Sequence, residues 1–317
     1  MLLTNHIITV ALFLLLFCLN TNIFCDETNS YKSFLHQVWL KGQEEFKANN
    51  YKDAIAIWKK GLEFAQDLKD KSGILIFQNH IGIAYGDQKK YKQAIKFFKQ
   101  AMKNCNVNED CYNRIPIVLN NLGATYINLG QNKIALRYYL EALPISRKIN
   151  NINLEKDVLN EIASIYSEQK EYRKLIECFM QLLEIYRKMK DVNNEASILH
   201  HIGIAYSNIA ESNKAINYFK LSIEINSSNK KLYNLQGNYL DLGLLYEKIS
   251  HYKQALVYYK KALHINKKIK NKHDEAYALY LISGILNEMG KYKEALENLQ
   301  KSLSINREFN NNTFRKK

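Results

Sequence analysis

Small, apolar and aromatic residues recur along the chain with a period of about forty residues. In each period a small residue is followed twelve positions later by Ala or Leu, and four positions after that by an aromatic residue or Leu. Apolar residues spaced three and four positions apart are typical of amphipathic helices, so the pattern predicts seven units of two helices each. The small residues are Gly42, Gly82, Gly123, Ala163, Gly203, Gly243 and Ser283; the later positions are Ala54, Ala94, Ala135, Leu175, Ala215, Ala255 and Ala295, then Trp58, Phe98, Tyr139, Phe179, Phe219, Tyr259 and Leu299.

Short polar segments separate the two predicted helices of each unit, for example Asn49-Asn50 and Gly130-Gln131. One helix pair is too small to bury its own apolar face, so neighbouring pairs must stack and share a continuous core. We therefore expect an all-α repeat array over residues 26–309, followed by a polar tail at residues 310–317.

The small residues should let two helix backbones approach, and the aromatic residue should fill the gap between neighbouring pairs. The fourth unit departs from this pattern, because it has Ala163 and Leu175 where most units have Gly and Ala. We expect the helices of this unit to lie slightly further apart.

Composition supports the helical interpretation. Only 2 Pro and 12 Gly occur in 317 residues, which disfavours a turn-dense β-sandwich or barrel. The hydrophobic share of 47% excludes a wholly disordered chain.

The repeated pattern, seen for example in Gly82-Ile83-Ala84-Tyr85 followed by Ala94 and Phe98, resembles the tetratricopeptide repeat. The resemblance covers about residues 31–309. Typical repeats of that family have about 34 residues, and the longer unit here is similar to the repeats of kinesin light chain, Rap-type quorum regulators and G-protein-signalling modulators. It implies a right-handed α-solenoid that binds proteins, without specifying which ones.

The amino-terminal segment has a different character. Residues 1–25 contain no Lys, Arg, Asp or Glu, and the thirteen residues from Ile7 to Leu19 have Thr9 as their only polar member. This run is shorter than the roughly twenty residues that span a membrane and is typical of a secretory signal, with cleavage after Cys25. We expect export to the periplasm, the cell envelope or the medium. The alternative of a membrane-anchored or cytoplasmic protein remains, because no basic residue precedes the apolar run as it does in most secretory signals.

Three cysteines follow this segment. Cys105 and Cys111 flank a polar stretch that is expected to be a loop, and in an oxidising compartment they can form a disulfide. Two free thiols are the alternative. Cys178 lies in an apolar helical pattern and is expected to be a buried small residue.

Candidate binding residues lie on the first helix of each unit, which in stacked helix pairs lines the concave groove. Three positions before the small residue stand Asn79, Asn120, Asn160 and then His200. A carboxamide both donates and accepts, so such a column can bond the backbone of an extended peptide. The resemblance to kinesin-light-chain-like and Rap-like repeats implies the same use of Asn79, Asn120 and Asn160.

The chain is rich in Asn throughout, so an exposed Asn on a helix can also be only a solvated residue. A net hydrogen bond contributes about 0.5 to 1.5 kcal/mol, so four such side chains scarcely reach micromolar affinity without apolar pockets. The further candidates for groove contacts are Ile83, Asn128, Ile204, Asn208 and Leu244.

No pattern predicts catalysis, a metal site or a cofactor. His200 and His201 are adjacent, and no pair of cysteines has the spacing of a zinc site. No glycine loop for phosphate is present. We expect no enzymatic activity.

The net charge is +14, with Lys concentrated on the second helices and turns, and most such runs are solvated surface. The sequence favours a non-catalytic scaffold that binds an extended peptide or protein segment in its concave groove. The alternative is a regulatory or sensory segment that acts by oligomerisation, through exposed Leu296 and Leu303 in the last unit, or by a basic surface that binds an acidic partner. Nucleic acid is not expected as a partner if the chain is exported.

Overall fold

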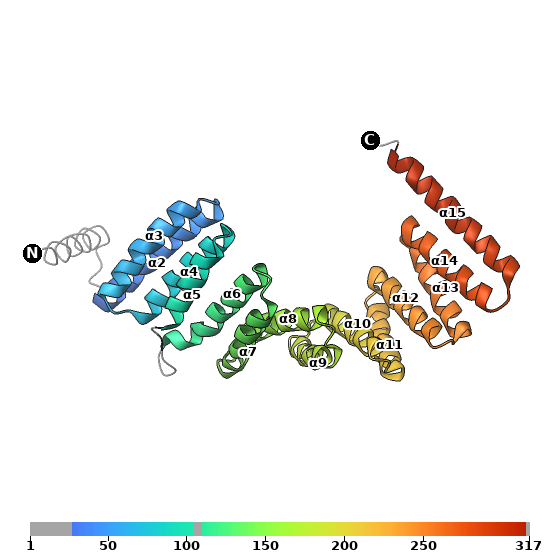
Figure 1. Ribbon diagram of the computed structural model, residues 1–317, viewed down its shortest axis with the longest axis horizontal. Helices are drawn as coiled ribbons and strands as arrows, with labels where there is room; N and C mark the ends of the chain where they lie inside the picture. Colours follow the sequence, from blue (N-terminus) through green and yellow to red (C-terminus); the bar gives the residue numbers. More distant parts are fainter. Residues whose placement is uncertain (1–26, 104, 106–109, 315–317) are drawn as a thin grey trace, which may run out of the picture. The chain divides into compact units, whose positions relative to one another are not determined.

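The computed structural model describes residues 27–103, 105 and 110–314, and its regular elements are all helical (Figure 1). The expected signal segment, residues 1–25, lies outside the described residues. The described part contains seven consecutive helix pairs, which confirms the predicted all-α repeat array. The first helices are α2 (Glu27–Lys47), α4 (Lys71–Asp87), α6 (Ile115–Asn128), α8 (Ile152–Glu168), α10 (Val192–Asn208), α12 (Leu232–Lys248) and α14 (Lys272–Glu288). The second helices are α3 (Tyr51–Asp67), α5 (Tyr91–Lys103), α7 (Asn132–Lys148), α9 (Tyr172–Lys188), α11 (Ser212–Ser228), α13 (Tyr252–Lys268) and α15 (Tyr292–Phe314).

The last helix extends beyond the expected end of the array. α15 continues to Phe314, whereas the sequence pattern placed a polar tail from residue 310. Polar residues do not stop a helix by themselves, and neither Gly nor Pro occurs between residues 310 and 314.

Short turns set the period of forty. Most helices have 17 residues, and three residues separate each helix from the next, except between α5 and α6. One residue of each such turn adopts a left-handed backbone, and the next amide donates to the carbonyl five residues earlier, as Asp70 N does to Ala65 O at 2.9 Å. The left-handed residues are Asn49, Lys69, Lys89, Gly130, Asn150, Lys170, Lys190, Ala210, Lys230, Ser250, Lys270 and Gly290.

In the five repeats whose small residue is glycine, here called the regular repeats, the aromatic residue packs on that glycine. A Cβ placed on Gly82 would lie 2.6 Å from the ring of Phe98, and one on Gly243 would lie 2.5 Å from Tyr259. These rings are almost completely buried. The aromatic side chain therefore closes the gap within its own helix pair, where the sequence pattern suggested the gap between pairs. The same contact occurs at Gly42 with Trp58, Gly123 with Tyr139 and Gly203 with Phe219.

A disulfide marks the one long connection among the described helices. Cys105 and Cys111 are bonded, so of the two states that the sequence left open the structure has the disulfide. Cys111 lies in a short 3₁₀-helix, η1 (Asp110–Arg114), that leads into α6. Cys178 is buried, as expected.

The contacts between residues divide the described chain into two compact parts, each with several helix pairs, which are called the first and the second unit from here on. The first unit ends at Val158 and the second begins at Leu159, within α8. The expected binding positions fall in both units.

Candidate functional site

The fourth helix pair, α8 with α9, is called repeat four here, and the other pairs are numbered in the same way. Repeat four carries larger residues than the neighbouring repeats at four positions where helices approach. Ala163 takes the place of Gly or Ser, and Leu175 takes the place of Ala. Leu182 stands where the other repeats have Gly, Ala or Ser, and Tyr186 where they have Ala, Cys, Ser or Asn. All four side chains are buried. Packed helices cannot approach more closely than their interface side chains allow, so we expect these residues to set a wider helix spacing in repeat four.

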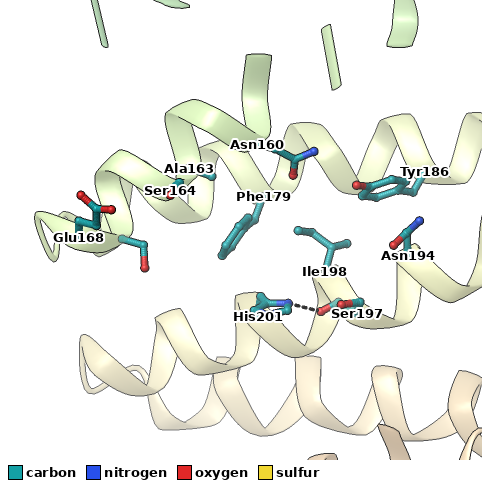
Figure 2. Close-up of a pocket in the computed structure, with 11 residues that line it drawn as sticks. Asn160, Ala163, Ser164, Glu168, Phe179, Tyr186, Asn194, Ser197, Ile198 and His201 are labelled. Atoms are coloured by element: carbon teal, nitrogen blue, oxygen red, sulfur yellow. Dashed lines mark hydrogen bonds between the residues drawn. The ribbon is translucent and has the colours of Figure 1, made fainter. Parts of the chain in front are cut away.

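The aromatic residue of repeat four is correspondingly displaced from the core. The methyl group of Ala163 occupies the place where the rings of other repeats lie, and Phe179 is half-buried instead of fully buried. The centroid of its ring lies 5.9 Å from that of His201 on α10. Figure 2 shows the Phe179 ring projecting into the space between the helix of Asn160 and the helix of His201.

A cavity of about 430 Å³ opens at this point, with all its lining residues in the second unit. Ala163, Tyr186 and Ile198 are its buried residues and form an apolar floor together with Phe179. The other lining residues are polar and form the rim: Asn160, Ser164, Ser167, Glu168, Asn194, Ser197 and His201.

The rim carries no positive charge at neutral pH. Neither Lys nor Arg is among the lining residues, although the chain has 45 of them, and Glu168 contributes a carboxylate. His201 Nδ1 lies 2.7 Å from the carbonyl oxygen of Ser197, so a neutral ring donates from Nδ1 and presents Nε2 as an acceptor. Desolvation lowers the pKa of the His201 imidazole, and nearby His200 acts in the same direction. The neutral form of the ring therefore predominates at pH 7.

A second, smaller cavity of about 210 Å³ adjoins the first, and Ser197 and His201 line both. Its floor is polar, because the carboxamides of Asn226 and Asn238 are buried there. Both donate to the hydroxyl of Ser222, Asn238 Nδ2 over 2.6 Å and Asn226 Nδ2 over 3.3 Å. This network fixes the floor, so the first helices of repeats four to six present one apolar cavity beside one polar cavity.

The candidate residues of the second unit lie on α8, α10 and α12. Asn160 is exposed at the rim of the larger cavity, and His200 lines the smaller one. Ile204 and Leu244 are exposed on the first helices. Asn208 is exposed, and its Nδ2 donates to the carbonyl oxygen of Ile204 over 3.0 Å.

The candidates of the first unit have different surroundings. Asn79 is only 6% exposed, and its Oδ1 accepts from Asn121 Nδ2 over 2.9 Å. Asn120 is half-buried, and its Oδ1 has no hydrogen-bond partner among the described residues. Ile83 is half-buried and Asn128 is exposed at the end of α6. Asn79 therefore bonds the neighbouring repeat, whereas Asn120 keeps an acceptor unused.

The bond between Asn79 and Asn121 belongs to a series of lateral bonds. A residue three positions before the small residue bonds the residue two positions before the small residue of the next repeat. Trp39 Nε1 donates to His80 Nε2 over 3.1 Å in the first unit. His200 Nε2 and Asp241 Oδ2 lie 2.6 Å apart in the second unit. Asn79 and His200, two members of the column expected to bind a peptide, thus each bond a neighbouring first helix.

The residues that sequence reasoning missed are those of the cavity floor and much of its rim. The repeat pattern assigns Phe179 to the core, and it does not single out Tyr186 or Ile198. Leu182 and Tyr186 are larger than the residues at the same positions of the other repeats. This difference is visible in the aligned sequence and is the signal that could have located the cavity. Among the described residues, no group of three or more His, Cys, Asp or Glu side chains has a metal-binding arrangement, and none of the described helices has the length and hydropathy of a membrane span.

Comparisons with known proteins agree with this repeat architecture. Models of the tetratricopeptide repeat match residues 77–106, 118–153, 154–228 and 235–308, more than half of the chain. A search of curated proteins found no match.

Solved structures with a similar fold have low sequence identity. The apo form of RapI is 18% identical, with a TM-score of 0.52 over 87% of this chain and 99% of that one. The C-terminal part of a tetratricopeptide repeat protein from Cytophaga hutchinsonii is 18% identical, with a TM-score of 0.58 over 84% and 98%. Putative kinesin light chain repeats from Podosopora anserina are 15% identical, with a TM-score of 0.51 over 63% and 99%. The matched models and the seven observed helix pairs show that the chain belongs to the tetratricopeptide repeat family.

Proposed function

We propose that this protein is a non-catalytic interaction scaffold whose repeats four to six bind an extended segment of a partner protein along their first helices. The observation that carries the proposal is the cavity at α8 and α10, which combines an apolar floor with a rim of hydrogen-bonding side chains. Sites with an apolar floor and a few placed polar groups are typical of ligand recognition.

The surroundings of the cavity favour a segment of chain over a small molecule. Ile204 on α10 and Leu244 on α12 add exposed apolar surface on the first helices outside the cavity. Asn160 can both donate to and accept from a peptide backbone. Because hydrogen bonds contribute about 0.5 to 1.5 kcal/mol each and micromolar affinity needs about 8 kcal/mol, buried apolar contacts must supply much of the binding free energy.

Selection of binders from a random library of displayed 12-residue peptides tests the proposal on the full chain. We expect selected peptides to bind with micromolar Kd in fluorescence polarisation. The substitution Asn160→Ala should weaken them roughly three- to tenfold, the effect of one hydrogen bond. The matched control is Asn213→Ala, which removes an exposed carboxamide from second helix α11. Equal affinity for both variants and the unchanged chain would place binding elsewhere.

Self-association through the last repeat is a second candidate, favoured by two exposed leucines on α15. Leu296 is 56% exposed, whereas its counterpart Ile176 in repeat four is 7% exposed. Leu303 is 48% exposed, whereas its counterpart Leu183 is 3% exposed. Sedimentation of the full chain and of a Leu296→Glu, Leu303→Glu variant tests this. A monomer at high concentration in both would exclude it.

Export is the proposed localisation. The disulfide between Cys105 and Cys111 supports it, since such bonds persist in oxidising compartments. Mass spectrometry of the protein from its own cells tests it, because cleavage would leave Asp26 as the first residue.

A further inference from the structure

We infer that the cavity of repeat four is a socket for one large apolar side chain of the bound segment. The inference rests on the proposed function and specifies which side chain the site selects. The socket is the space bounded by Ala163, Phe179, Tyr186 and Ile198.

The socket exists because repeat four lacks the contact that closes the regular repeats. In those repeats an aromatic ring lies against a glycine, and a Cβ at the glycine would approach the ring to 2.1–2.8 Å, too close for both to stay. The chain has this Cβ at Ala163, and Phe179 has moved toward solvent. A ring that is fully buried elsewhere thus becomes one wall of an open space.

The other walls keep that space from collapsing. Tyr186 lines the space, and Leu182 stands four residues before it on α9. Both are buried and larger than the residues at the same positions of the other repeats. Ile198 is buried on α10, opposite Phe179 in Figure 2. An apolar surface held open in this way is not covered within the described chain, and a ligand side chain would remove it from water.

Size and chemistry define the occupant. The volume of about 430 Å³ is at the lower end of the range for small-molecule pockets and holds one large side chain, with room left for the adjoining backbone. The walls are aromatic and aliphatic, so Phe or Leu is favoured over a charged side chain, whose desolvation nothing in the floor offsets. Burial of such a side chain predicts a roughly ten- to hundredfold preference over Ala.

The rim adds a preference for the residues on either side of this anchor. Glu168 is acidic, the rim has no Lys or Arg, and His201 is neutral at pH 7. An acidic residue beside the anchor would therefore meet no positive partner at the rim. We expect selected peptides to have a large apolar anchor without flanking Asp or Glu.

A direct test uses two small probes on the full chain, N-acetyl-phenylalanine amide and N-acetyl-alanine amide. The methyl groups of isoleucine are observed by NMR during titration with each probe. The Ile198 methyl resonances should shift with millimolar phenylalanine probe and stay unchanged with the alanine probe. Equal shifts with the two probes, or none with either, would overturn the socket.

Two variants test the origin of the socket. Ala163→Gly should let Phe179 settle against residue 163 and should abolish the shift of Ile198. Ser164→Trp should block the exposed rim without altering the floor, with the same result. The matched control is Gly284→Trp at the same position of repeat seven, where a Cβ meets no atom within 4 Å. If the probe response survives both variants, the cavity is not the binding site.

The selected peptides separate this inference from the proposed function. Peptides that bind and depend on Asn160, but carry no large apolar anchor and tolerate Ala163→Gly, would refute the socket and retain the groove. Peptides whose affinity does not depend on Asn160 would refute binding in the groove, irrespective of the NMR response to the two probes.

Discussion

Asn121 Nδ2 donates to Asn79 Oδ1 over 2.9 Å and so joins α6 to α4. Asn79 is buried, which means that its oxygen has little access to water when the donor is removed. A buried acceptor without a partner costs about 1 to 3 kcal/mol. The bond is therefore a structural link between neighbouring first helices.

We predict that Asn121→Ala lowers the free energy of unfolding by about 1 to 3 kcal/mol, measured in urea. Asn128→Ala is the control, because Asn128 is exposed on the same helix and should change the free energy by about 0.5 kcal/mol or less. Similar values for the two variants would show that the lateral bond does not stabilise the fold.

The fold was predictable because seven copies of one pattern constrain it. Glycine opposite an aromatic residue at a fixed spacing indicates a close helix pair, and Ala163 opposite Phe179 is recognisable as a departure from it in the aligned repeats alone. The lateral bonds were not predictable in the same way. They join residues 41 or 42 positions apart, and which side chains meet depends on the rotation of each helix relative to the next, which a periodic pattern leaves undetermined.

The candidate site was predicted only in part. Asn160 and His200 do line cavities on the first helices. The depth of the site depends on Tyr186 and Phe179. The repeat pattern assigns Phe179 to the core and does not single out Tyr186. The space that they enclose follows from the packing of repeat four and not from the type of any single residue.

A buried carboxamide in repeat six predicts a stabilising substitution. Asn266 is completely buried, and neither of its side-chain polar atoms has a hydrogen-bond partner among the described residues. Its counterpart in repeat five is Asn226, whose partners Ser222 and Asn238 are replaced one repeat later by Ala residues. We predict that Asn266→Ala raises the free energy of unfolding by about 1 kcal/mol, since it removes an unpaired polar group.

The same substitution one repeat earlier is the matched control. Asn226→Ala removes a carboxamide that is bonded to Ser222 and Asn238, so urea unfolding should show a loss of about 1 to 3 kcal/mol. A destabilising Asn266→Ala would mean that this side chain has partners in solution, such as a buried water molecule.

His80 predicts a pH-dependent stability of the first unit. Its Nε2 accepts from Trp39 Nε1, and its Nδ1 lies 2.7 Å from the carbonyl oxygen of Ile76. Burial lowers the pKa of His80 from the ordinary 6.5, and Arg114 acts in the same direction. The folded chain therefore binds this proton less readily than the unfolded chain, and the contribution of His80 to stability is present above pH 6.5 and is lost as the pH falls below it.

Tryptophan fluorescence can follow this protonation directly. The chain has two Trp residues, and the rings of both Trp39 and Trp58 lie within 6 Å of His80. We expect the emission of the folded protein to change in an acid titration with a midpoint below 6.5, and urea stability to fall over the same range. His80→Gln should remove both effects. A titration that persists in this variant would assign it to another group.

Left-handed residues at the turns predict a further stabilising change. Ala210 has φ of 60°, where the Cβ of a non-glycine residue costs about 1 to 2 kcal/mol. Glycine avoids this cost but loses more conformational entropy on folding, by about 0.4 to 1 kcal/mol. We predict that Ala210→Gly raises the free energy of unfolding by about 0.5 to 1 kcal/mol in urea. Ala56→Gly, at an exposed position within α3, is the matched control and should lower it by about 1 kcal/mol because glycine is a poor helix former. If both substitutions are destabilising, the turn after α10 does not keep its left-handed residue in solution.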